Sequence, residues 1–67
     1  MNKLPERLKE LREEKAMFQS QLATELKVGQ STIARWESGK RVPDIDDAIK
    51  IAQYFGVTTD YLFGLED

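Results

Sequence analysis

Apolar residues recur at helical spacing along this chain, and polar residues interrupt them at short intervals. Leu4, Leu8 and Leu11 fall at positions i, i+4 and i+7, and charged side chains occupy the opposite face. Valine, isoleucine and threonine nowhere alternate with polar residues for long enough to form a half-buried strand. The pattern therefore predicts an all-α fold.

Interruptions of the spacing divide the chain into five predicted helices. Asp44 is expected to cap the fourth helix, and Thr58 or Thr59 the fifth, because their side chains accept hydrogen bonds from first-turn amides. Glycine follows each of the last three helices, where its left-handed conformation ends a helix. The predicted helices cover residues of about 5–15, 19–26, 30–37, 45–55 and 59–63.

Helices of this length are marginal in isolation, so we expect them to pack around one shared core. Trp36 is predicted to lie in that core because it falls opposite the polar face of its helix. Leu62 is predicted to point inward from the last helix. The predicted buried face of the fourth helix consists of Ile45, Ala48, Ile51, Ala52 and Phe55.

Length and composition narrow the range of functions. The 67 residues predict a single domain over 1–67, with no room for a separate effector domain. Cysteine and histidine are absent, which excludes disulfides, Cys/His zinc sites and histidine acid–base chemistry. We therefore expect no enzyme activity, no catalytic or metal-binding residue, no cofactor and no small-molecule substrate. No apolar run approaches the roughly 20 residues that cross a bilayer, so we expect a cytoplasmic protein without a membrane partner.

The acidic cluster of Asp44, Asp46 and Asp47 has two interpretations. A calcium-binding loop beginning at Asp44 would need glycine at its sixth position and glutamate at its twelfth. Ile49 and Phe55 stand there instead. Carboxylates are favourable in the first turn of a helix, so the cluster is interpreted as a helix cap.

Residues 19–38 carry the pattern that points to a function. They predict two short helices separated by three residues, and Ala23 is small enough to let these helices cross closely. Apolar side chains are positioned to fill the angle between the helices. Such a helix-turn-helix pair presents its second helix to the major groove of DNA.

Short motifs extend this pattern over most of the chain. They are LKELREEK, Gln19-x-x-Leu22-Ala23, Ser31-Thr32-Ile33, Trp36-Glu37-x-Gly39, Arg41-x-Pro43 and Phe55-Gly56-Val57-x-x-Asp60-Tyr61-Leu62. In this order and spacing the chain resembles the phage-repressor/Cro (XRE-type) helix-turn-helix family over nearly all of its length. The resemblance implies a compact five-helix, lambda-repressor-like DNA-binding domain, with Arg12 and Glu37 forming a structural pair.

Three positions depart from the residues usual in that family. Phe18 stands where serine or threonine usually caps the second helix, so that cap is expected to be weak. Lys27 replaces the common turn glycine, at a cost on the order of 1 kcal/mol for a left-handed residue. Gly29 replaces a second Ser/Thr cap, which lowers helix stability by only about 0.3 kcal/mol. None of the three removes a base-reading or core position.

The resemblance also implies two sets of DNA contacts. The residues expected to contact bases are Gln30, Ser31, Thr32 and Arg35. The residues expected to contact phosphates are Gln19, Lys40 and Arg41. Glutamine pairs with adenine and arginine with guanine in the major groove. The alternative for both sets is an ordinary solvated surface.

The same resemblance implies a sequence-specific transcriptional regulator of bacterial or phage origin. It would bind double-stranded DNA as a homodimer on a pseudo-palindromic operator, and repression by occluding a promoter is the expected output. Tyr61 and Phe63 are the candidates for the dimer interface. The alternative function is a protein-interaction module on the same fold, such as an antitoxin or an anti-repressor partner.

The formal net charge of −2 does not exclude DNA, because the charge is unevenly distributed. Residues 17–43 hold four basic and two acidic side chains, whereas residues 44–67 hold one basic and six acidic side chains. The predicted DNA-binding face is therefore modestly positive and is backed by an acidic region. Such polarity orients a domain on a polyanion and reduces non-specific binding.

Overall fold

The computed structural model describes residues 2–66 and contains five α-helices, with no strand among these residues. The helices are α1 Leu4–Glu14, α2 Gln19–Leu26, α3 Gln30–Ser38, α4 Ile45–Phe55 and α5 Thr59–Phe63. The predicted all-α class is confirmed, and every predicted helix boundary lies within one residue of the observed boundary. No helix in the described part of the chain is long and apolar enough to cross a membrane.

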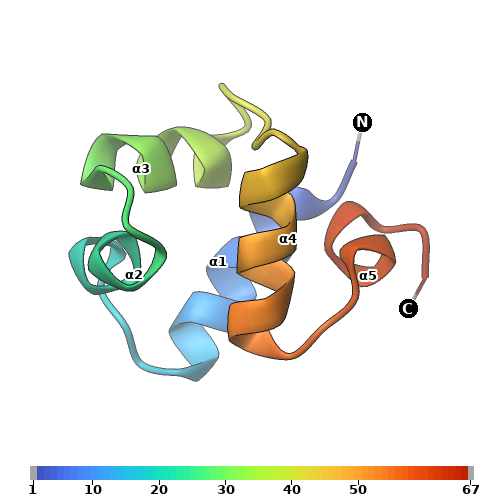
Figure 1. The fold of residues 1–67 in the computed structure, drawn as a ribbon, viewed down its shortest axis with the longest axis horizontal. Helices are drawn as coiled ribbons and strands as arrows, with labels where there is room; N and C mark the ends of the chain where they lie inside the picture. The colour runs from blue at the N-terminus through green and yellow to red at the C-terminus, as the bar shows by residue number, and fades with distance from the viewer. Residues whose placement is uncertain (1, 67) are drawn as a thin grey trace.

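Helix α1 contacts both ends of the fold. Figure 1 shows α1 and α4 in the middle, with α2 and α3 on one side and α5 on the other. Helix α1 packs against α3 and α5, and α2 packs against α3 and α4. The backbone amide of Lys3 donates to the carbonyl of Phe63 at 3.3 Å, which ties the start of α1 to the end of α5.

One hydrophobic core joins all five helices, as the spacing predicts. Trp36 is 1% exposed and Leu62 is fully buried, so both inward predictions are confirmed. The buried cluster consists of Leu4, Leu8, Leu22, Ala23, Leu26, Ile33, Trp36, Ile51, Ala52 and Leu62. Burial of this apolar surface is the main stabilising contribution in so small a chain.

The prediction that Ile45 lies in the core is wrong, because its side chain is 78% exposed. Ile45 is the first residue of α4, and the first buried residue of that helix is Ala48, one turn later. Helical spacing gives the direction of a side chain around the axis, but it does not show how far neighbouring helices extend along that axis. Phe55, at the other end of α4, is only partly buried.

Side-chain caps mark where two helices begin, and left-handed glycines mark where three helices end, at the positions that the sequence indicates. The Asp44 side chain accepts from the amide of Asp47 at 2.8 Å, and Thr58 accepts from the amide of Tyr61 at 3.0 Å. Both capping predictions are confirmed, with Thr58 rather than Thr59 as the fifth cap. Gly39, Gly56 and Gly64 adopt positive φ values directly after α3, α4 and α5.

Candidate nucleic-acid interface

The turn between α2 and α3 sets the direction of the second helix. Lys27 adopts the left-handed conformation, with φ 59° and ψ 43°, as predicted for a residue in the glycine position of the turn. The amide of Val28 then donates to the carbonyl of Ala23 at 3.0 Å, and Ala23 is buried beneath the crossing. The close approach of the two helices holds α3 at the surface.

Helix α3 has one buried side and one polar side. Ile33 and Trp36 are buried, so they fix the rotation of the helix about its axis. The predicted base-contacting residues fall on the other side: three are exposed and one, Thr32, is partly buried. The exposed three are Gln30, Ser31 and Arg35.

The loop after α3 folds back over the last turn of that helix. The amides of Lys40 and Arg41 both donate to the carbonyl of Arg35, at 3.0 and 3.3 Å, and Gly39 provides the left-handed turn with φ 79°. Both basic side chains are exposed. The fold therefore brings the predicted phosphate contacts Lys40 and Arg41 next to the predicted base contact Arg35.

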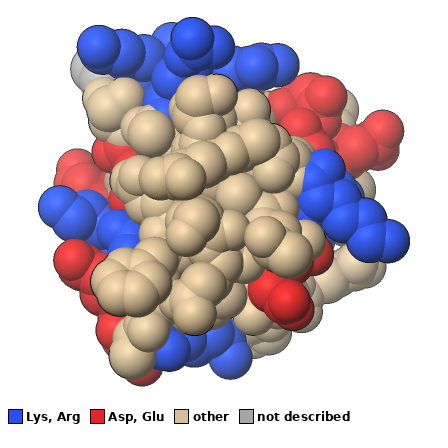
Figure 2. Space-filling view, turned by 90° about the vertical axis from the view of Figure 1, so that its left-hand side faces the viewer, with Lys and Arg blue, Asp and Glu red and all other residues tan. Residues whose placement is uncertain are grey.

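The surface formed by α2 and α3 is mostly uncharged. Figure 2 shows this side, with Lys and Arg side chains along its upper edge at the height of α3 and the following loop. Uncharged polar groups suit hydrogen bonding to base edges, whereas cations suit phosphates. The arrangement matches a surface that reads bases in its middle and meets a phosphate backbone at its edge.

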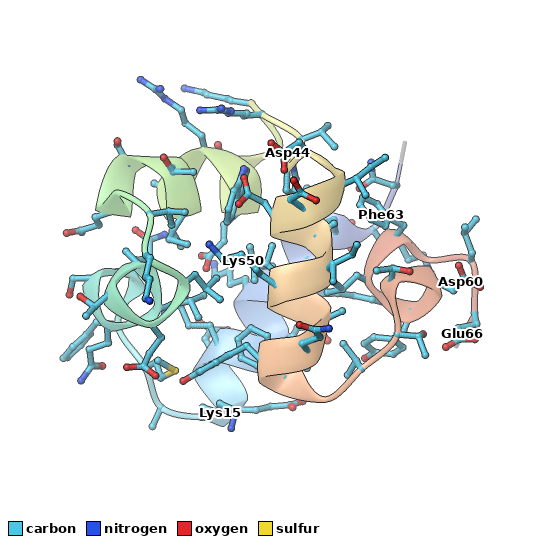
Figure 3. The ribbon with its side chains drawn as sticks, viewed as in Figure 1. Lys15, Asp44, Lys50, Asp60, Phe63 and Glu66 are labelled. Carbon is cyan, nitrogen blue, oxygen red and sulfur yellow. The ribbon has the colours of Figure 1, made fainter. Side chains whose placement is uncertain are left out.

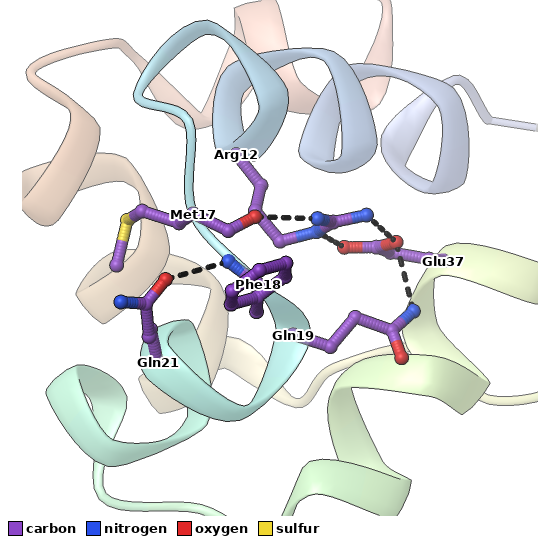
Figure 4. Close-up of polar contacts among 6 residues, drawn as sticks. All are labelled: Arg12, Met17, Phe18, Gln19, Gln21 and Glu37. Carbon is purple, nitrogen blue, oxygen red and sulfur yellow. Dashed lines mark hydrogen bonds and ion pairs between the residues drawn. The ribbon is translucent and has the colours of Figure 1, made fainter.

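An ion pair fastens α3 to α1 directly beneath this surface (Figure 4). Arg12 Nε lies 2.6 Å from Glu37 Oε2, and Arg12 Nη2 donates to Glu37 Oε1 at 3.0 Å. The two side chains are 11% and 5% exposed. The hydrogen bond to Glu37 raises the pKa of Arg12 above its ordinary value. The predicted structural pair is confirmed, and the guanidinium neutralises the only carboxylate of α3.

Gln19 joins the same network. Its side-chain Nε2 donates to Glu37 Oε1 at 3.1 Å, so one side-chain hydrogen is used inside the protein. Its backbone amide lies in the first turn of α2 and has no hydrogen-bond acceptor among residues 2–66. That amide and the second side-chain hydrogen are the groups that Gln19 can offer to a phosphate.

Packing brings to this surface one cation, Lys9, that is not among the predicted DNA contacts. Lys9 lines an open concavity of about 370 Å³ together with Gln19 and Ser38. Arg12 and Glu37 form its floor. Lys9 lies one helical turn before Arg12, so its position on the same face of α1 was a usable signal.

The two dimer candidates lie away from α3. The guanidinium of Arg7 covers the ring of Tyr61 at 4.2 Å from the ring centre. Phe63 lies on the α5 side of α4, across α4 from α2 and α3 (Figure 3). It lines an apolar groove of about 290 Å³ with the exposed side chains of Ile45 and Ile49.

Known proteins resemble the chain in both sequence and structure. Residues 8–62 match the helix-turn-helix family. The chain is 40% identical over 62 residues to the HTH-type transcriptional activator BcrR of Enterococcus faecalis. It is 34% identical over 64 residues to the HTH-type transcriptional regulator ImmR of Bacillus subtilis.

These alignments cover 92% and 96% of this chain but 30% and 50% of the two relatives, so the chain spans at most half the length of either. A crystal structure of a transcriptional regulator from Listeria innocua has a TM-score of 0.91 and 33% sequence identity. That similarity covers 100% of this chain and 63% of the Listeria chain.

Proposed function

The chain belongs to the helix-turn-helix family, and we propose that it binds a specific DNA operator as a transcriptional regulator. The observation that carries the proposal is the two-sided α3, with Ile33 and Trp36 buried and a polar side free of carboxylates. The only acidic residue of α3 is Glu37, and Arg12 neutralises it. A helix of this kind fits a major groove without charge repulsion.

In this proposal the side chains of α3 read bases. Gln30 lies in the first turn and Arg35 follows more than one turn later, so each contacts a different base pair. Glutamine hydrogen bonds to adenine and arginine to guanine, each contributing about 1–3 kcal/mol of discrimination. Ser31 and Thr32 contact the bases or backbone between them.

Phosphate contacts hold α3 in register. Lys40 and Arg41 approach one stretch of the DNA backbone, and the amide of Gln19 approaches another. The support for this assignment is that the two basic side chains are exposed and the Gln19 amide lacks an acceptor in the described chain. Such contacts position a protein on DNA without reading its sequence.

We further propose that two copies bind together, through the groove lined by Ile45, Ile49 and Phe63. Support comes from the exposure of Ile45 and Ile49 on a surface separate from α3. Two-fold symmetry would match a pseudo-palindromic operator with half-sites roughly 34 Å apart. Tyr61 stays a second candidate for this interface, with its ring already in contact with Arg7.

The proposed output is repression in the cytoplasm, by occupying a promoter. One relative is named an activator, so the sign of regulation depends on where the operator lies and on what else the regulator contacts. A reporter gene placed behind a selected operator distinguishes the two outcomes: expression falls on addition of the protein if the proposal is right and rises if the protein activates.

Fluorescence anisotropy over a salt series tests DNA binding itself. The logarithm of the association constant is expected to fall linearly with the logarithm of salt concentration, with a slope of about −0.9 for each phosphate contacted. A protein-interaction module with no DNA role would show no binding to a labelled duplex at low salt. That result would reject the proposal.

A further inference from the structure

Phe18 is the most exposed aromatic residue of the protein. Its side chain is 74% exposed, whereas the other five aromatic residues are buried or partly buried. Phe18 occupies the N-cap of α2, with φ −77° and ψ 158°. A single exposed apolar residue is ordinary on a protein surface, so its position in the fold decides whether it matters.

Phenylalanine is a poor residue for this position. An N-cap side chain normally accepts a hydrogen bond from a first-turn amide, and a phenyl ring cannot accept one. Only the reverse contact forms here, in which the Phe18 amide donates to Gln21 Oε1 at 2.8 Å. The amides of Gln19 and Ser20 have no acceptor among residues 2–66. The ring therefore replaces a stabilising cap and buries little surface within the protein.

The ring lies next to Gln19, one of the proposed phosphate contacts. Figure 4 shows Phe18 beside the Gln19 side chain, where the loop from α1 enters α2. Gln19 in turn lines the concavity that also holds Lys9 and Ser38. A DNA strand whose phosphate meets the Gln19 amide would run over this edge of the molecule.

We propose that the Phe18 ring packs on a deoxyribose of that strand, next to the phosphate held at Gln19. This inference rests on the proposed DNA-binding function. A DNA backbone alternates anionic phosphates with sugars whose carbon faces are apolar, so a cation or amide and an adjacent apolar ring match neighbouring parts of it. The ring adds affinity without adding charge, which suits a chain whose net charge is −2.

Three substitutions at Phe18 distinguish the effect of the aromatic ring from the effect of an N-cap hydrogen bond. Phe18→Ala removes the ring and supplies no cap, Phe18→Ser removes the ring and supplies a cap, and Phe18→Tyr keeps the ring. Leu65→Ala is the matched control, because Leu65 is 77% exposed and follows α5, on the side of the fold away from α2. Each protein is titrated against a short labelled duplex recovered by selection from a random pool.

Loss of the ring is expected to weaken binding about tenfold in both Phe18→Ala and Phe18→Ser. The slope of affinity against salt should stay unchanged, because no phosphate contact is lost. Phe18→Ser should also melt about 4–8 °C higher than the original protein, because it gains a cap. Higher stability together with weaker binding cannot arise from damage to the fold. Phe18→Tyr and Leu65→Ala should bind as the original protein does.

Distinct results overturn the inference. If Phe18→Ala binds as well as the original protein, the ring does not contact DNA and is available to a protein partner instead. If Phe18→Ser binds weakly but Phe18→Ala does not, the serine hydroxyl has accepted a hydrogen bond from the α2 amides that would otherwise meet the phosphate. The ring then has no role in binding. If the original protein binds no duplex at low salt, the proposed function fails and this inference fails with it.

Discussion

At the scale of single residues, Trp36 is the largest side chain buried in the core. It is 1% exposed, and its indole nitrogen has no hydrogen-bond partner among the described residues, so its contribution comes from packing. We predict that Trp36→Ala lowers the free energy of unfolding by about 3–5 kcal/mol, measured by urea denaturation. Trp36→Phe, which keeps a ring and removes the unpaired N–H, should cost much less. A folded Trp36→Ala protein that loses only DNA affinity would contradict this assignment.

The ion pair between Arg12 and Glu37 is the second residue-scale prediction. Removing one partner leaves the other as a nearly buried, unpaired charge, so Arg12→Ala should cost about 3 kcal/mol or more in unfolding free energy. Lys50→Ala is the control. Lys50 lies 4.0 Å from Asp47 in a partly exposed pair, and solvent-accessible pairs contribute less than about 1 kcal/mol. Equal losses in both variants would show that burial does not distinguish the two pairs.

The pH dependence of the stabilisation by this ion pair follows from the direction in which the pKa of Arg12 is shifted. The hydrogen bond to Glu37 raises the pKa of Arg12, so the stabilisation is fully present below the pKa of arginine in the unfolded chain. It is lost only as the pH rises through the still higher pKa of the folded protein. The cost of Arg12→Ala should therefore be the same at neutral and mildly alkaline pH. A cost that falls between these two conditions would contradict the assigned cause.

At the scale of elements, α3 and the following loop should affect DNA binding in different ways. Gln30→Ala and Arg35→Ala should each weaken discrimination at one operator position by about 1–3 kcal/mol, with melting temperatures nearly unchanged because both side chains are exposed. Competition with operators that carry single base changes measures this loss. A uniform loss on all sequences would show that the two residues contact only phosphates.

Lys40→Ala is the matched variant from the loop. It should weaken binding to every sequence equally and reduce the magnitude of the salt slope by about 1. Lys27→Ala is a control for general charge, because Lys27 lies in the turn before α3 and has no assigned phosphate contact. If Lys27→Ala changes the slope as much as Lys40→Ala does, the effect is one of net charge rather than of a particular contact.

Elements were the most predictable part of this fold. Apolar spacing located the helices, and Asp44 and Gly39 marked boundaries because capping and left-handed turns depend on local chemistry. Ile45 was misplaced because its burial depends on how far neighbouring helices extend. Lys9 is absent from the predicted site because its proximity to Gln19 arises only when α1 packs against α3. Contacts between elements depend on tertiary packing, which periodicity does not encode.

At the scale of the whole molecule, the polar side of α3 and the apolar groove lie on separate surfaces. The proposed dimer depends on Ile45 and Ile49, which are 78% and 41% exposed. We predict that Ile45→Asp lowers the sedimentation-derived association constant by tenfold or more, about 1.4 kcal/mol or greater, and leaves the fold intact because Ile45 is outside the core. Leu65→Asp, at a similarly exposed site beyond the groove, should leave association unchanged.

The dimer proposal has two contradicting outcomes. If Ile45→Asp and the original protein associate equally, the groove is not the interface. If the original protein binds its selected DNA only as single copies, the dimer itself is wrong. The predictions for Gln30 and Arg35 of α3 would be unaffected by either result, because one copy of α3 reads one half-site.

Whether α3 reads bases can be measured by selecting the sequences that the protein binds from a random pool of duplex DNA. The original protein is expected to enrich one short motif, repeated about one helical turn away in inverted orientation. The same selection with Arg35→Ala should recover that motif with one position relaxed. Failure to enrich any motif with the original protein, or an unchanged motif with Arg35→Ala, would contradict the account of α3 as a base-reading helix.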